Sequence, residues 1–113
     1  MDLREFLEKG KGLKISEKRC VTEDRIDIAF FSTETEKWRA LLTEILGPEA
    51  KPAGVKPTSA DMKVTAEYGG IWERQTLFKK EFGDSIVIAM FWPWQTDEYT
   101  TLKINRVKKK GGI

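Results

Sequence analysis

Histidine is absent from the 113 residues, and this absence excludes more chemistry than any other feature of the sequence. Without an imidazole there is no Ser-His-Asp or Cys-His arrangement and no histidine-ligated metal. The commonest general base near neutral pH is also missing. A single cysteine, Cys20, supplies too few thiols for a zinc site. We therefore expect no metal and no cofactor, and we favour a protein that is not an enzyme.

Paired cysteines and long apolar runs are missing as well. Cys20 cannot form an intrachain disulfide, whereas a small secreted domain more often carries several. No run approaches the roughly 18 apolar residues that span a bilayer. The opening stretch, MDLREFLEKGKG, lacks the basic start and apolar core of a signal peptide. These absences predict a cytoplasmic protein with no membrane segment.

An excess of either charge is the third feature that the sequence lacks. Lysine and arginine number 20 and aspartate and glutamate 18, so the formal net charge is only +2. Such a balance keeps a small protein in solution and does not by itself indicate a nucleic-acid partner. Hydrophobic residues make up 40%, enough for one core in a chain of this length. We expect residues 1–113 to form one domain.

The clearest helix signal follows a strand. Residues 26–31 alternate in the manner of a strand, and Thr33 with Glu36 matches a capping box. Apolar residues then recur at helical spacing from Trp38 to Leu46, and Gly47-Pro48 ends the pattern. A helix is predicted over 34–46.

The second half of the chain reads as an antiparallel meander over 62–68, 71–80, 85–92 and 98–107, with Gly69-Gly70 as a tight hairpin turn. Residues 2–9 favour a short helix and 13–21 an edge strand. A long Pro-rich loop covers 47–61, and 108–113 form a basic tail. The expected fold class is α+β: four to six mainly antiparallel strands on one principal helix, in the order (α)(β)βαββββ.

This sheet has more apolar side chains than one helix can cover. In the wholly apolar run 86–92, successive residues point to opposite faces, so both faces need a cover. Helix 34–46 can shelter one of them. The cover of the other face is then the N-terminal helix, a curl of the sheet, a second subunit or a ligand.

Aromatic residues supply the first candidate site, because rings with a polar edge line ligand pockets and protein interfaces. We predict a binding or regulatory module that contacts a protein partner or an apolar small ligand, with self-association as a homodimer as a corollary. The candidate binding residues are Phe31, Trp72, Phe78, Phe91, Trp92, Trp94 and Tyr99.

Two alternatives stay open. One is single-stranded nucleic acid, bound by sheet aromatics and a basic surface. That surface would consist of Lys103, Arg106, Lys108, Lys109 and Lys110. The other is an enzyme that works with paired carboxylates. Its candidate residues would be Asp27, Glu67, Glu73, Asp97 and Glu98.

Overall fold

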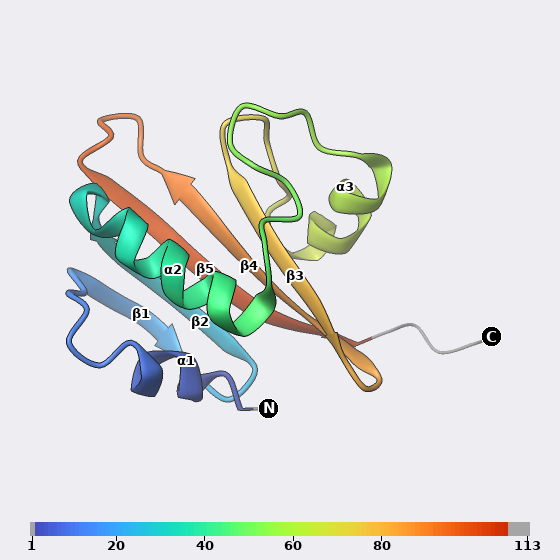
Figure 1. The fold of residues 1–113 in the computed structure, drawn as a ribbon. Helices are drawn as coiled ribbons and strands as arrows, with labels where there is room; N and C mark the ends of the chain where they lie inside the picture. Colours follow the sequence, from blue (N-terminus) through green and yellow to red (C-terminus); the bar gives the residue numbers. More distant parts are fainter. Residues whose placement is uncertain (1, 109–113) are drawn as a thin grey trace.

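The computed structural model describes residues 2–108, which form a five-stranded antiparallel sheet with strand order β1-β2-β5-β4-β3 (Figure 1). The predicted α+β class is confirmed. The strands are β1 (Glu17–Val21), β2 (Arg25–Phe31), β3 (Thr76–Phe82), β4 (Ser85–Pro93) and β5 (Tyr99–Lys108). The helices are α1 (Arg4–Lys9), α2 (Thr35–Leu46) and α3 (Ser59–Thr65), with 3-10 turns η1 (Ser32–Glu34) and η2 (Ala66–Tyr68).

The first face of the sheet is covered by α2 and α1. The register places Ile26 opposite Ile104 and Ile28 opposite Leu102, so these side chains share one face. They are fully buried against Trp38 and Leu42 of α2, together with Leu3 and Phe6 at the N-terminus. Helix α2 thus lies where its apolar stripe predicts, and the short N-terminal helix docks beside it rather than on the opposite face.

The start of α2 differs from the prediction. Thr33 forms no capping box; it lies inside the 3-10 turn η1, and Glu34 is the N-cap residue without a side-chain cap bond. The Thr35 hydroxyl instead donates to the Ser32 carbonyl at 2.7 Å. The extra turn tightens the exit from β2, so the helix begins two residues beyond the residue predicted to cap it.

The strand predicted over 62–68 is wrong, because this segment is helical. A capping box stands at its start: the Asp61 amide donates to Thr58 Oγ1 at 3.1 Å, and the Thr58 amide donates to Asp61 Oδ2 at 3.0 Å. Alternation of apolar residues over so few positions is compatible with both a strand and a helix, and the capping box favours the helix. Gly69-Gly70 therefore closes a 3-10 turn instead of a hairpin, and β3 starts at Thr76, not at residue 71.

The second face is covered only in part. Val64 of α3 and Tyr68 of η2 pack on Leu77, Ile88 and Met90, which lie on β3 and β4. Beside them, Gly69 adopts a φ of +99°, and a Cβ at this position would collide with the ring of Trp92. The α3 segment is therefore seated closely on β4, and the half of this face that β1, β2 and β5 form is left without a helix.

The long loop before α3 is anchored by a buried lysine. Lys51 is 1% exposed, and its Nζ donates to the carbonyls of Pro52 at 2.8 Å, Glu73 at 2.8 Å and Gln75 at 2.5 Å. Backbone bonds between Lys51 and Leu77 add a bridge to β3. All three donors of the ammonium are used, so residues 47–58 are tied to the segment that precedes β3.

Candidate binding surface

The uncovered half of the second face is organised by the pairing of β5 with β2 and β4. Trp92, Thr101 and Ala29 face one another across three strands, and Met90, Lys103 and Asp27 do so in the next row. Tyr99 stands opposite Phe31 in the row at the end of β2. Strands far apart in the sequence thus bring aromatic and polar side chains together on one surface.

Three aromatic rings form a continuous row on this surface, which we call the aromatic ladder: Phe31, Tyr99 and Trp94. The ring centroids of Phe31 and Tyr99 lie 5.0 Å apart, and those of Tyr99 and Trp94 lie 4.8 Å apart. Phe31 is 42% exposed and Trp94 36%. Such rings can accept a ligand without any rearrangement of the core.

A tight turn places Trp94 over Tyr99. The Trp94 amide donates to the Tyr99 carbonyl at 2.9 Å, and the Asp97 amide donates to the Trp94 carbonyl at 2.9 Å. Asp97 has a φ of +59°, in the left-handed region that aspartate tolerates better than most residues. Without this turn, Trp94 would continue away from the sheet beyond Pro93.

Beneath the rings lies a small polar layer. Thr101 Oγ1 accepts from Trp94 Nε1 at 2.9 Å and from Arg19 Nη1 at 3.3 Å. Arg19 Nη1 also donates to Asp27 Oδ1 at 3.2 Å, and its guanidinium carbon is 5.8 Å from the centre of the Trp94 ring. Although no helix covers them, Asp27 and Thr101 are only 8% and 5% exposed, because these long side chains lie across them.

Lys103 and Trp92 form the border between the ladder and the α3 segment. Lys103 Nζ lies 3.8 Å from the centre of the Trp92 ring, a cation–π contact. Desolvation lowers the pKa of Lys103 below its usual value, an effect that the negative charge of Asp27 opposes. Within residues 2–108, no carboxylate lies in ion-pair range of this ammonium.

The arginines on and around this surface are already paired. Arg19 lies 3.5 Å from a Glu17 oxygen as well as 3.2 Å from Asp27, and Arg25 lies 3.9 Å from Asp27. At the turn between β4 and β5, Arg74 Nη2 donates to Asp97 Oδ1 at 3.2 Å. The surface is therefore aromatic and only weakly basic, because two arginines share Asp27 and Lys103 has no carboxylate in ion-pair range within residues 2–108.

The predicted aromatic residues fall into three places. Phe31, Tyr99 and Trp94 form the ladder, with Trp92 at its border. Phe78 and Phe91 pack edge to face at 5.9 Å on the first face, where both are buried in the main core. Trp72 is 65% exposed on the loop after η2, beside a depression of about 270 Å³ that Met62 and Ile71 also line.

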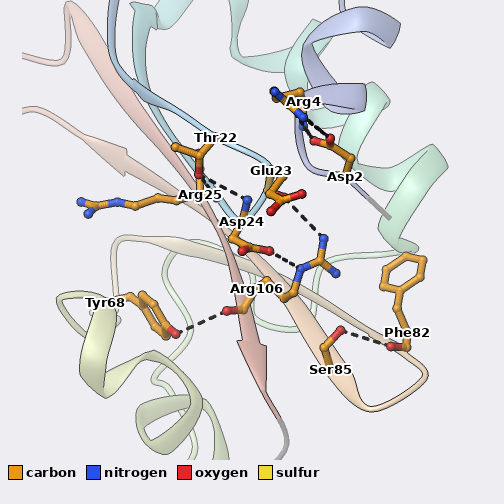
Figure 2. A network of polar contacts seen from close by, with 10 residues as sticks. All are labelled: Asp2, Arg4, Thr22, Glu23, Asp24, Arg25, Tyr68, Phe82, Ser85 and Arg106. Carbon is orange, nitrogen blue, oxygen red and sulfur yellow. Dashed lines mark hydrogen bonds and ion pairs between the residues drawn. The ribbon is translucent and has the colours of Figure 1, made fainter.

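The predicted basic residues do not form one surface in the described part of the chain. Lys103 lies on the second face, but Arg106 stands opposite buried Val87 and reaches toward the turn between β1 and β2. There its Nε donates to Asp24 Oδ1 at 2.7 Å and its Nη2 to the Glu23 carbonyl at 3.4 Å (Figure 2). Lys108 is exposed at the end of β5. Lys109 and Lys110 lie outside the described residues.

The predicted carboxylates are spread over several elements. Asp27 contacts arginines, and Asp97 contacts Arg74. Glu67 lies in η2 and Glu73 on the loop after it, and Glu98 is an exposed residue directly before β5. Between residues 2 and 108, no group of three or more acidic or cysteine side chains is arranged to hold a metal ion.

Arg19 and Thr101 were not predicted as site residues. Arg19 lies where the β1–β2 register shifts between Lys18 and Cys20, and no turn or glycine signal in the sequence marks this bulge. Thr101 could have been found by parity, since it is two residues from Tyr99 on the same strand face. The polar layer thus depends mainly on pairing between distant strands.

Comparison of the chain with protein-family models, with curated proteins and with solved structures finds no match. No helix within residues 2–108 is both long enough and apolar enough to cross a membrane.

Proposed function

We propose that the protein is a non-catalytic binding or regulatory module that contacts a protein partner or an apolar small ligand through the aromatic ladder. The observation that carries this proposal is the row of closely spaced rings, two of them exposed, on the half of a sheet face that no helix covers. Burying such rings is favourable, because each can remove a large apolar area from water on contact. A cytoplasmic location is part of the proposal and rests on the lone thiol of Cys20.

Nuclear magnetic resonance with a library of uncharged aromatic and aliphatic fragments tests this proposal. We expect the amide signals of Phe31, Tyr99 and Thr101 and the indole signal of Trp94 to shift, because the exposed rings lie in this region. Phe31→Ala should weaken the binding of these fragments about tenfold, and Trp72→Ala, which removes a more exposed ring elsewhere, should not. Fragments that gather beside Trp72 instead would overturn the proposal.

Single-stranded nucleic acid is the second candidate, favoured by the presence of exposed rings and a guanidinium on a sheet face. Against it stands the pairing of Arg19, Arg25 and Arg74 with carboxylates. A phosphate chain would have to compete with these ion pairs. Binding of a labelled oligothymidylate that falls steeply with salt would favour this candidate over the first.

A further inference from the structure

Building on the proposed function, we propose that the aromatic ladder binds an extended, proline-rich segment of a partner protein in the polyproline II conformation. Four features support this assignment: the small area of the surface, the spacing of its rings, its free hydrogen-bond donors, and two sheet edges that are poorly suited to pairing with an added strand.

The size of the surface favours a segment over a folded partner. The uncovered half of the second face is about three strands wide, at about 4.8 Å per strand, and about seven residues long, at about 3.3 Å per residue. Its area is therefore roughly 300 Å². A stable interface between folded proteins needs about 800 Å² on each side. A contact this small cannot compensate for ordering a flexible chain, but polyproline II is largely preformed in solution and loses little entropy on binding.

The spacing of the rings fits this conformation. Successive centroids lie 5.0 Å and 4.8 Å apart, so the row from Phe31 to Trp94 extends over at most about 10 Å. One turn of a polyproline II helix has three residues and rises about 9.3 Å. A single turn therefore spans the ladder and can place a pyrrolidine ring on each end.

Two unused polar groups of the surface are donors. Lys103 Nζ and Arg19 Nη2 make no hydrogen bond to any residue within 2–108. Consecutive prolines have no N–H and offer only carbonyl acceptors, which point outward because this helix has no internal hydrogen bonds. Donors on the protein thus meet acceptors on the ligand, and the segment needs no charged side chain to accept from them.

Addition of a strand at an edge of the sheet is the competing way to bind a peptide. Edge strand β1 carries Glu17, Lys18 and Arg19 and is bulged, features that discourage pairing. On the opposite edge, Leu77 of β3 already forms a bridge with Lys51 of the long loop. The ladder is therefore the better receptor for an extended chain.

Titration of the labelled protein with decaproline tests the inference, with a Gly-Ser peptide of the same length as the control. We expect the signals of Phe31, Tyr99, Thr101 and the Trp94 indole to shift with a dissociation constant on the order of 0.1–1 mM, which is typical of a small contact. The affinity should change less than twofold between 50 and 300 mM salt, since no ion pair forms.

Phe31→Ala and Tyr99→Ala should each weaken decaproline about tenfold, and Trp72→Ala should leave its affinity unchanged. Each variant is first checked for a native spectrum, and Phe31→Ala, at an exposed position, keeps the test valid if Tyr99→Ala does not fold. The inference is overturned if decaproline causes no shift, if the Gly-Ser peptide shifts the same signals equally, or if an oligothymidylate or a second copy occupies the ladder instead. Uncharged fragments that still bind at the ladder would then leave the proposed function intact.

Discussion

Some side chains in this protein form hydrogen bonds with backbone groups outside the helices and strands. Lys51 is the clearest case, since one buried ammonium satisfies three carbonyls from two loops. Burial lowers the pKa of Lys51, and the negative charges of Asp61, Glu73 and Glu49 oppose that shift. Lys51 thus supplies hydrogen-bond donors to loop carbonyls that no helix or strand satisfies.

Replacing Lys51 by methionine tests this role. The substitution keeps most of the side-chain volume but leaves three buried carbonyls without donors, so we expect a loss of roughly 2–4 kcal/mol in the free energy of unfolding. Urea denaturation measures the change. Lys56→Met, at an exposed position of the same loop, is the matched control and should stay within about 0.5 kcal/mol. Equal effects of the two substitutions would contradict the anchoring role.

At the scale of elements, the α3 segment decides which half of the second face is closed. Its seat on the sheet depends on the contact between Gly69 and Trp92, where no side chain fits. The same Trp92 ring carries the Lys103 ammonium 3.8 Å from its centre. The α3 segment covers one half of the second face, and through its contact with Trp92 it also positions the border of the uncovered half.

Gly69→Ala tests this seat, with Gly54→Ala as its control. Both glycines have positive φ, +99° and +87°, so both substitutions impose backbone strain, but only the Gly69 change also collides with Trp92. We expect Gly54→Ala to cost about 1 kcal/mol and Gly69→Ala about 2–4 kcal/mol. The tryptophan emission spectrum should shift in the Gly69 variant alone. If the two variants unfold at the same urea concentration, the close contact does not stabilise the segment.

The whole molecule is a sheet with one closed face and one half-closed face. This surplus of apolar side chains predicts self-association. The ion pairs of Asp27 with Arg19 and Arg25 reduce the charge repulsion between two copies, which favours that expectation. The area of the open half of the second face, roughly 300 Å² by strand geometry, disfavours a dimer formed through it alone.

Sedimentation velocity decides between these outcomes. If the ladder joins two copies, the protein sediments as a dimer at tens of micromolar, and Phe31→Glu, which places a charge in the row of rings, converts it to monomer. A monomer across that concentration range leaves the ladder free for another partner. A dimer that Phe31→Glu does not dissociate would place the contact elsewhere, for example around exposed Trp72.

Local patterns in the sequence were enough to predict α2, β2, β4 and β5, because helix and strand periods and their end signals depend on neighbours along the chain. The alternation of side chains also placed Phe31 on the face opposite Ile28. Absences were equally informative at this level, because a chain with no histidine and one cysteine cannot form histidine-dependent catalytic sites or cysteine-rich zinc sites.

Only the tertiary structure decided which strands are neighbours, and with that which residues meet. Phe31 lies beside Tyr99 because β2 pairs with β5, a contact between segments 68 residues apart that no local pattern encodes. Packing on the assembled sheet also buries Phe78 and Phe91 and seats residues 59–68 as a helical segment. The bulge under Arg19 arises in the pairing of β1 with β2, which no local signal marks. Local propensity selects elements, whereas the burial of apolar area and the satisfaction of backbone groups across the whole chain select their arrangement.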